Sequence, residues 1–583
     1  MNQTRSFLLI AWLVVATLLW MEWSKGQLVA TPAASPSPVA TTPATTTRPE
    51  ANAPVTGLAP APGATASPVA APVAPALPAA PGAMGSASSS RPITLANDTL
   101  RLTVDLIGGR ITDSQLLQYT LEKKAGSPNV RLLDSSSATF QTAEAGFISM
   151  DSKSVQKVLD AQFQTATGAN SFVLADGADT LSVALTWTDP GTGLVVNRML
   201  TLNRGSYVLQ IDDKISNAGP AAQYLYPFVR LARVAPPPPP KHSFLTNPDA
   251  FSFVGAAWYT PEGKYDKTPF SQYSKETPPV GAVSDGWIAM LQHHFVTAWV
   301  PQPNDPQVQF NTAVETRAGV PLFVVRSVAN ALNIAPGESA ERHNRLWVGP
   351  KLQAPMAALS ETLPLSVDYG KLAVIGKPLF WLLAKLHALL GNWGWAIIAI
   401  VVLLKAALYP LSAKQYQSMA KMRAVQPRIE ALKERYGDDK QQFQVAMMEL
   451  YKKEKINPIG GCLPMLIPIP IFLGLYWVLI ETVELRQAPW MGWIQNLTAA
   501  DPYFILPVLN LTVMYLTQKL TPMPGIDPIQ KKMMQFMPLV FGVMMAFFPA
   551  GLVLYWVTNG LLGLLQQWWI TKQHGPKTVL VAK

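Results

Sequence analysis

The sequence predicts a multi-domain membrane protein in which an all-β domain precedes an α-helical bundle of membrane spans. Three observations carry this prediction. A region of period-two apolar alternation follows a stretch of small residues and proline, which is typical of half-buried strands after a linker. Long apolar runs then dominate the C-terminal third of the chain. Basic residues gather in alternate segments between those runs, as in a multi-pass protein.

The chain has 583 residues, a formal charge of +10 and one cysteine, Cys462. One cysteine excludes an internal disulfide bond, and it fits a small apolar residue on a buried helix face. A basic chain can bind nucleic acid or anionic lipid, or it can be a membrane protein with positive cytoplasmic loops. The location of the basic residues favours the last of these, so nucleic acid is not needed to explain the charge.

Residues 1–24 are predicted to form an N-terminal membrane segment. An apolar run from Phe7 to Trp20 follows Arg5, and Trp23 lies just beyond it. This pattern fits an uncleaved anchor with interfacial tryptophans and also a cleaved signal peptide. In either case the chain after it is exported. Residues 25–91 consist mostly of Ala, Pro, Thr, Ser and Gly, and we expect a disordered linker there.

Residues 92–350 are predicted to form one periplasmic all-β domain of the sandwich type. The residues from Leu100 to Leu106 alternate between apolar and polar. The runs Leu181–Trp187 and Leu194–Leu202 flank Asp189-Pro190-Gly191 and predict a hairpin. No cluster of His, Cys or carboxylate residues indicates a metal or catalytic site in this domain, and we expect no cofactor.

After the β domain the sequence predicts one interfacial helix and five membrane spans. The helix at 371–391 is expected to lie in the interface, because lysines and a histidine recur among its apolar residues. The following segments are span 2 at 392–411, a cytoplasmic helical hairpin at 412–461, span 3 at 462–480, span 4 at 503–518, span 5 at 533–548, span 6 at 551–570 and a tail at 571–583. The short break between the last two spans predicts antiparallel neighbours.

The distribution of charge predicts the orientation of these spans. Residues 412–461 and 571–583 are rich in lysine, whereas the segment 481–502 holds only Arg486 as a basic residue. Because basic loops stay in the cytoplasm, we expect a cytoplasmic hairpin and C-terminus and a periplasmic β domain, in an inner membrane.

The cytoplasmic segment is predicted to be two amphipathic helices that join near Gly437, with Asp438 or Asp439 capping the second. The apolar stripes of the two helices include Met419, Met422, Tyr436, Phe443 and Met447. These side chains could pack the two helices together, or they could meet varied apolar partners.

Lys405 interrupts the second span, where a lysine facing lipid costs at least ~2–3 kcal/mol. The side chain could snorkel to the headgroups, or it could face a hydrated cavity. No Asp or Glu lies within the apolar runs to pair with it. Candidate polar neighbours on the last span are Thr558, Asn559, Gln566 and Gln567. We therefore expect an open, wet groove on the cytoplasmic side.

Several short motifs resemble the YidC/Oxa/Alb family of membrane-protein insertases, in its Gram-negative form. They are Asn392-Trp393-Gly394, Tyr409-Pro410-Leu411, Asn457-Pro458-Ile459-Gly460-Gly461-Cys462, Val483-Glu484-Leu485-Arg486 and Gly551-Leu552-Val553-Leu554-Tyr555-Trp556. The resemblance covers roughly residues 371–570. It implies a non-enzymatic insertase and chaperone that uses a positive inner-leaflet groove, with a β-supersandwich domain in the periplasm. In most relatives we expect arginine at the position of Lys405, and lysine keeps that charge without the bidentate fork.

The resemblance also implies partners and contact positions. The partners are nascent membrane proteins, the Sec translocon with its accessory subunits, the ribosome and an anionic lipid bilayer. The client-contact positions map onto Pro464, Ile469, Phe472, Val540, Met544, Tyr555 and Trp556. Two other function classes remain as alternatives. A secondary transporter would require inverted repeats and paired charges, and a Ser–Lys protease would require Ser412 beside Lys405.

Overall fold

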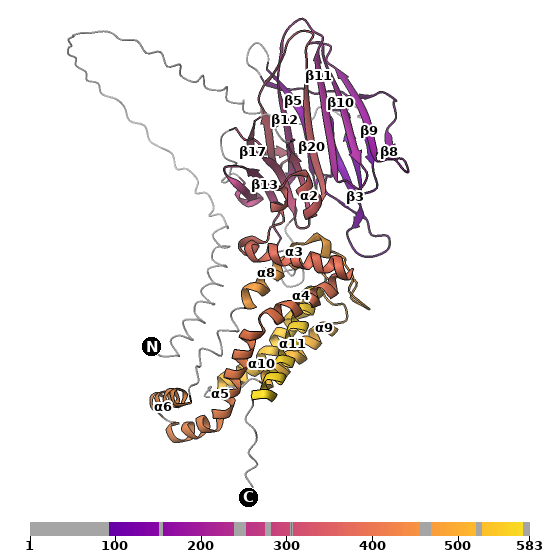
Figure 1. Cartoon of the computed structure of the whole chain (residues 1–583). Coiled ribbons are helices and arrows are strands. Elements are labelled where there is room, and N and C mark those ends of the chain that lie inside the picture. The colour runs from indigo at the N-terminus through magenta and orange to yellow at the C-terminus, as the bar shows by residue number, and fades with distance from the viewer. Residues whose placement is uncertain are drawn as a thin grey trace, which may run out of the picture. The chain divides into compact units, whose positions relative to one another are not determined.

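The computed structural model describes residues 92–150, 156–237, 252–273, 282–302, 305, 307–437, 439–454, 468–520 and 528–574 (Figure 1). The predicted N-terminal anchor, the predicted linker, Pro464 and the end of the C-terminal tail lie outside the described residues.

Two β-sheets form the first described domain, which confirms the predicted all-β class. The strands of the first sheet are β1 (Ile93–Ala96), β2 (Leu100–Asp105), β3 (Arg110–Thr120), β4 (Asn129–Arg131), β5 (Gln141–Met150), β6 (Gln156–Val158), β8 (Ser171–Val173), β12 (Gln223–Val234), β17 (Val308–Arg317), β18 (Val320–Ala329) and β19 (Leu332–Ile334). The strands of the second sheet are β7 (Gln164–Thr165), β9 (Thr180–Thr188), β10 (Leu194–Asn203), β11 (Val208–Asn217), β13 (Gly255–Thr260), β14 (Lys264–Pro269), β15 (Trp287–Gln292), β16 (Phe295–Val300) and β20 (Ser339–Pro350).

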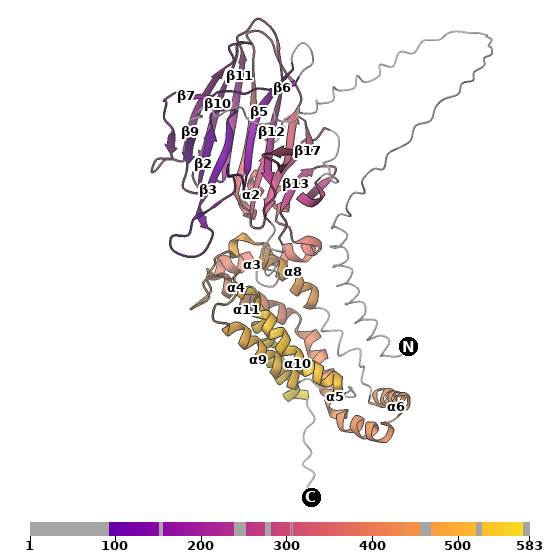
Figure 2. The ribbon, with the colours of Figure 1, turned by 180° about the vertical axis from the view of Figure 1, so that it is seen from behind.

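The strand order makes each sheet wide and largely antiparallel. The first sheet runs β17-β18-β12-β5-β3-β2-β1-β8, and the second runs β14-β13-β15-β16-β20-β11-β10-β9-β7. The long pairs β10–β11, β11–β20 and β12–β5 are antiparallel, whereas β1 and β8 pair in parallel. The sheets face each other as a sandwich (Figure 2), and apolar side chains from both build one core that includes Trp258, Trp287 and Trp347.

The predicted alternation and the predicted hairpin are both confirmed. Strand β2 buries Leu100, Leu102 and Val104 and exposes Arg101 between them. Strands β9 and β10 pair in antiparallel register, and the turn between them is closed by the Gly193 N–H, which donates to the carbonyl oxygen of Asp189 at 2.9 Å. The period-two pattern therefore reports burial on one face of each strand.

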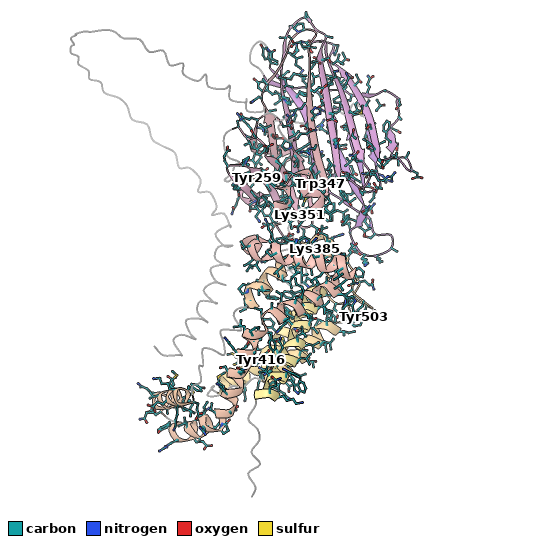
Figure 3. The ribbon with its side chains drawn as sticks, in the orientation of Figure 1. Tyr259, Trp347, Lys351, Lys385, Tyr416 and Tyr503 are labelled. Carbon is teal, nitrogen blue, oxygen red and sulfur yellow. The ribbon has the colours of Figure 1, made fainter. Side chains whose placement is uncertain are left out.

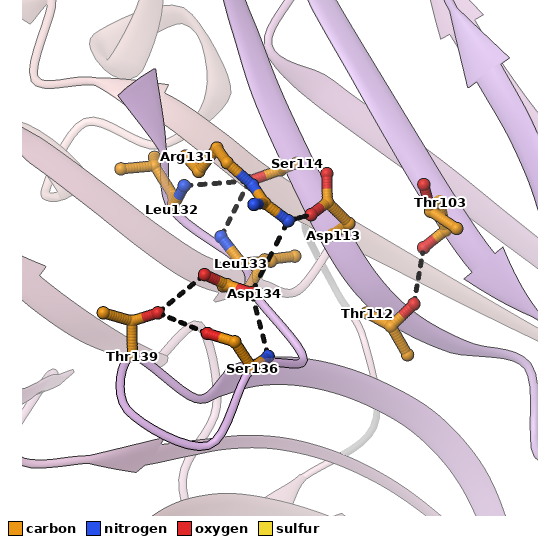
Figure 4. Close-up of polar contacts among 10 residues, drawn as sticks. All are labelled: Thr103, Thr112, Asp113, Ser114, Arg131, Leu132, Leu133, Asp134, Ser136 and Thr139. Carbon is orange, nitrogen blue, oxygen red and sulfur yellow. Dashed lines mark hydrogen bonds and ion pairs between the residues drawn. The ribbon is translucent and has the colours of Figure 1, made fainter. Parts of the chain in front are cut away.

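A polar network fixes the hairpin of β3 and β4 at the edge of the core (Figure 4). The hydroxyl oxygen of Ser114, on β3, accepts backbone N–H groups from Leu132 and Leu133 at 3.1 and 2.8 Å. Arg131 forms an ion pair with Asp113 across the same pair of strands. Because Ser114 is buried, these bonds satisfy two backbone donors that lie directly after the short strand β4.

The helices after the β domain confirm the predicted helical membrane core. They are α2 (Gln353–Leu359), α3 (Ala373–Leu390), α4 (Trp393–Ala407), α5 (Tyr409–Tyr436), α6 (Lys440–Lys453), α8 (Pro468–Glu481), α9 (Ile505–Leu520), α10 (Pro528–Met545) and α11 (Ala550–His574). Helix α11 packs on α4, α5 and α9, and α3 packs on α4 and α8. Helix α10, which was predicted beside α11, packs mainly on α9, and its Phe541 ring lies 6.4 Å from that of Trp556 on α11.

Length and apolar composition single out few of these helices as membrane spans. Among the described residues α3 is one continuous candidate, and α4 with Tyr409–Ser418 forms a second candidate bent by 65°. Ile469–Glu481 and Lys532–Met545 are apolar but shorter. The interfacial placement of α3 stays a prediction, which rests on the exposed Lys377 and on the exposed Lys385 (Figure 3).

The predicted span at 392–411 is not one straight helix. Asn392 caps α4, since its side-chain oxygen accepts the N–H groups of Gly394 and Trp395. The helix ends at Ala407, and α5 begins after Leu408. Pro410 explains the break, because a proline there has no N–H to donate and its ring would clash with the carbonyl of Ala406 in a continuous helix.

Two histidines of the β domain contact the C-terminal end of α8. The Nε2 atoms of His293 and His294 lie 3.0 and 2.9 Å from the carbonyl oxygen of Ile480, and their rings stack at 3.7 Å. A carbonyl oxygen can only accept, so each Nε2 in contact with it carries its proton and donates. Burial lowers the pKa of His294 well below its ordinary value, which keeps this ring neutral.

Buried charge lies at the same junction. Lys351, the residue after β20, is only 3% exposed (Figure 3). Burial lowers the pKa of Lys351 to about 8, and the nearby Glu481 carboxylate opposes that shift. Arg486 extends the contact, because its Nη2 donates to the carbonyl oxygens of Thr120 and Leu121 at 2.7 and 3.1 Å. These polar bonds attach the end of α8 and the following loop to the β domain.

Candidate functional site

The candidate site is built around Lys405, in the last turn of α4. Its side chain is half-buried and reaches toward Gly563 on α11. A β-carbon placed on Gly563 would lie 3.5 Å from both Lys405 Nζ and Tyr416 Oη. The Tyr416 hydroxyl, on α5, donates to the Gly563 carbonyl oxygen at 3.2 Å. Helices α4, α5 and α11 therefore meet at a glycine that leaves room for the ammonium group.

Lys405 has no carboxylate partner within the described part of the chain. None of the ion pairs formed between described residues includes it. A half-buried ammonium group without a counter-ion must keep its charge through water or through an incoming acceptor.

Polar side chains on α11 share a helix face with the same glycine. Asn559 lies four residues before Gly563 and Gln566 lies three residues after it, so all three share one helix face. Gln566 Oε1 is buried and has no hydrogen-bond partner among the described residues. Thr558, which precedes Asn559, is half-buried on the adjacent face. The structure thus brings Asn559 and Gln566 to the face of α11 that Lys405 approaches.

Gln567 has a different role from the one expected. Its Nε2 donates to the carbonyl oxygen of Leu520 at 3.0 Å, at the end of α9, and its side chain is buried. This bond ties α9 to α11, so Gln567 stabilises the packing of these two helices.

Tyr416 is a site residue that the sequence did not single out. It lies in the segment predicted as the cytoplasmic hairpin, where a tyrosine among lysines and glutamines is unremarkable. Only the bend at Leu408 directs the first turns of α5 along α11. The Tyr-Pro dipeptide at Tyr409-Pro410 is the signal that could have indicated such a bend.

The predicted client-contact positions divide into an exposed group and an aromatic stack. Ile469 on α8 and Val540 on α10 are 47% and 67% exposed. Phe472 stacks on Trp556 with the ring centroids 4.6 Å apart, which joins α8 to α11. Tyr555 is only 5% exposed and belongs to the core, so its side chain is not on the surface in this structure. Met544 is half-buried.

The predicted recruitment hairpin has a small core of its own. Met422 on α5 and Phe443 and Met447 on α6 pack around the buried side chains of Val425, Ile429 and Tyr451. Asp439 caps α6, because its Oδ1 accepts N–H groups from Gln441 and Gln442 at 3.0 Å each. The helix-packing interpretation therefore holds for these two methionines. Tyr436 is half-buried in the last turn of α5, and the side chain of Met419 lies outside the described residues.

No group of three or more His, Cys, Asp or Glu residues in the described ranges could hold a metal ion. The arrangement offers a cation, amides and an exposed apolar face. Such a surface can bind the polar flank and the apolar body of another chain.

Comparison with known proteins covers almost the whole chain. Residues 92–382 match the family model described as the YidC periplasmic domain, and residues 385–577 match that described as the 60Kd inner membrane protein. A membrane protein insertase YidC of Stenotrophomonas maltophilia (strain K279a) is 52% identical over 99% of this chain and 98% of the relative. The protein of the same name from Xanthomonas campestris pv. campestris (strain 8004) is 50% identical with the same coverage.

One solved structure that aligns over much of the chain is described as an active YidC insertase with its first transmembrane domain resolved. It is 18% identical, has a TM-score of 0.37 and covers 82% of this chain and 92% of that one. The two family models and the full-length relatives confirm the resemblance found in the motifs around Lys405. The chain therefore belongs to the YidC family of membrane protein insertases.

Proposed function

We propose that this inner-membrane insertase inserts and helps fold its clients through a hydrated, positively charged groove in the inner leaflet. Its substrates are nascent membrane proteins, as its family implies. The observation that carries the proposal is the half-buried Lys405, which has no carboxylate partner in the described part of the chain and lies beside Gly563 and Tyr416.

The charge of Lys405 acts on the unfavourable step of insertion, which is the passage of the client's polar flank. Transfer of an apolar helix into lipid is favourable, whereas passage of its polar flank through hydrocarbon is not. A wet groove that reaches partway across the bilayer shortens the uncovered path. Lys405 attracts an acidic flank into the groove, and the polar side chains of Asn559 and Gln566 offer hydrogen bonds there. The membrane potential then favours outward movement of the negative flank, without nucleotide hydrolysis.

The apolar body of the client needs a second surface. Ile469 and Val540 present exposed apolar side chains on α8 and α10, and the Phe472–Trp556 stack supports α8. We propose that a client segment slides along these two helices into the lipid. Pro464, Met544 and Tyr555 belong to the same proposed path.

The topology and partners complete the proposal. The β domain lies in the periplasm, as the family implies. We propose that the basic hairpin of α5 and α6 and the C-terminus lie in the cytoplasm, where the hairpin meets ribosomes, anionic lipid and new clients. The insertase is proposed to work alone or with the Sec translocon and its accessory subunits.

Reconstitution in liposomes tests the role of Lys405. The purified protein is combined with a small client that has an acidic translocated flank, and insertion is scored by protease protection. Lys405→Glu is expected to reduce insertion at least about tenfold, since repulsion replaces attraction over a low-dielectric path. Lys405→Arg is expected to insert as well as the original protein, because the charge is kept.

The control separates local charge from net charge. Lys414→Glu makes the same change at an exposed residue of α5 and is expected to leave insertion within about twofold, because exposed charges are screened by salt. Equal insertion by the original protein and Lys405→Glu would remove the charge role. An equal loss from Lys414→Glu would show that only the net charge matters.

A further inference from the structure

Helix α10 forms one side of the proposed client path, and a proline lies inside it. Pro538 has no N–H group, so it cannot donate the helical hydrogen bond to the carbonyl oxygen of Met534, four residues earlier. The proline ring also crowds this carbonyl and tends to tilt it away from the helix axis. A carbonyl without a partner is costly in a membrane helix, so a donor from a neighbouring helix is favoured.

Gln518 of α9 supplies that donor. Its side-chain Nε2 donates a hydrogen bond to the carbonyl oxygen of Met534. Gln518 is half-buried, and the two residues lie on neighbouring helices. The bond therefore joins α9 to α10 at the turn where Pro538 removes one of the hydrogen bonds of α10.

A second contact joins the same two helices on the other side of Pro538. A β-carbon placed on Gly542 would lie 3.0 Å from Cδ1 of Leu511 on α9, so the helices pack closely there. Met534 comes before the proline in the chain and Gly542 comes after it. Helix α10 is thus held by a polar bond before the proline and by an apolar contact after it.

Helix α9 is itself fixed to the rest of the bundle. The carbonyl oxygen of Leu520 accepts from Gln567 of α11 at 3.0 Å. Val513 of α9 packs on Gly560 of α11, where a β-carbon would lie only 2.5 Å from Cγ1 of Val513. Gln518 therefore projects from a helix that its neighbour holds in place.

Helix α10 depends on α9 for its position. It packs mainly on α9, and the side chains of Phe536 and Val540, on either side of Pro538, are 64% and 67% exposed. A helix bends most easily where a proline interrupts its hydrogen bonds. Without the bond from Gln518, the segment of α10 before Pro538 would move more freely relative to the segment after it.

We propose that Gln518 is a positioning residue for insertion, because it holds the first half of α10 in the orientation that a client segment meets. This inference rests on the proposed function, in which clients slide along α8 and α10. Gln518 acts through the Met534 carbonyl on the helix that presents Val540, rather than on the client itself.

Distances between spin labels test the positioning role in the full-length protein in liposomes. Cys462→Ser removes the single cysteine of the chain. Labels at the exposed residues Phe536 of α10 and Leu561 of α11 report the segment before Pro538, and labels at Val543 and Leu561 report the segment after it. Gln518→Leu is expected to broaden the first distance distribution about twofold or more and to leave the second unchanged, because α10 bends at the proline.

Pro538→Ala provides a rescue that depends on this hydrogen bond. Alanine restores an N–H group at position 538, which donates to the Met534 carbonyl oxygen within α10. Gln518→Leu combined with Pro538→Ala is therefore expected to recover the narrow distance distribution. A distribution that stays broad in the double variant would overturn the proposal.

Insertion assays connect the position of α10 to function. Gln518→Leu is expected to reduce insertion about three- to tenfold, the range that loss of one hydrogen bond gives, and adding Pro538→Ala is expected to restore it. Gln535→Leu makes the same change at an exposed position of α10 and is expected to alter neither readout. Normal insertion by Gln518→Leu despite a broader distribution would also reject the positioning role.

Gln518→Asn keeps the test decisive if Gln518→Leu does not fold. Asparagine retains an amide but is one methylene shorter, so the same broadening and the same loss of insertion are expected. Asparagine results equal to those of the original protein would contradict the proposal. The distances do not involve Lys405, so normal insertion by Lys405→Glu would reject the charged groove alone.

Discussion

Glu484 shows how one side chain couples the helical region to the β domain. It lies in the short turn after α8, and its Oε2 is buried without a hydrogen-bond partner among the described residues. Burial raises the pKa of Glu484 from 4.5 to about 7. Burial raises the pKa of Tyr119, at the far end of β3, and the Glu484 carboxylate adds to that shift. Near neutral pH this carboxyl therefore titrates inside the junction between the two regions.

The sign of the resulting pH dependence follows from linkage. The folded chain holds the Glu484 proton more tightly than the unfolded chain, so folding is favoured most below pH 4.5. Stability then falls as pH rises toward about 7, by up to ~3 kcal/mol at about 1.36 kcal/mol per pKa unit. Glu484→Gln mimics the protonated form, so we expect it to flatten this slope and to be more stable than the original protein at pH 8. Thermal unfolding midpoints between pH 5 and 8 measure the effect.

A carboxyl at the surface provides the comparison for that measurement. Glu341→Gln, at an exposed position of β20, removes the same charge without touching the junction and is expected to preserve the slope. If the thermal unfolding midpoint of Glu484→Gln still fell with rising pH as in the original protein, the pH dependence would come from other groups.

Among the elements, the α4–α5 pair shows where sequence reasoning succeeds and where it stops. Lys405 stands out from sequence because a lysine among apolar residues is costly in a bilayer. Helical spacing also predicts that Asn559 and Gln566 share one face of α11. The role of Tyr416 could not be predicted from sequence. Its contact with Gly563 depends on a 65° bend, and no local sequence pattern specifies the direction of that bend. Local periodicity predicts which residues share one face of a helix. Tertiary packing decides which other residues that face contacts.

The N-terminal cap of α6 leads to a prediction about the stability of the first turn of that helix. Asp439→Ala removes the side-chain acceptor for two N–H groups of the first turn and is expected to weaken that turn by ~1 kcal/mol. Amide hydrogen exchange in the first turn of α6 should become roughly fivefold faster. Asp439→Asn keeps an acceptor and should exchange nearly as slowly as the original protein. Equal exchange in the alanine and asparagine variants would show that the cap does not limit opening.

For the molecule as a whole, the sequence indicates the division into a β domain and helices but not how they join. Alternation and turn residues predict strands such as β2, β9 and β10, and apolar runs predict the helices. The junction joins residues far apart in the chain, such as His294 with Ile480 and Arg486 with Thr120. His294, Arg486 and Thr120 are ordinary in their local context, so their contacts across the junction could not be read from a window of sequence.

The junction leads to a prediction about how the two regions open. Arg486→Gln removes the charged donor to the carbonyl oxygens of Thr120 and Leu121 and the cation that lies over the Phe295 ring. Losing such bonds is expected to cost about 2 kcal/mol, so amide exchange should rise roughly 10- to 30-fold on both sides of the junction together. Mass spectrometry of exchange at the end of β3 and in the loop after α8 measures it. Arg101→Gln serves as the surface control. A rise confined to the loop, with β3 unchanged, would mean that the bond orders the loop alone and that the β domain is held by His293, His294 and Lys351 instead.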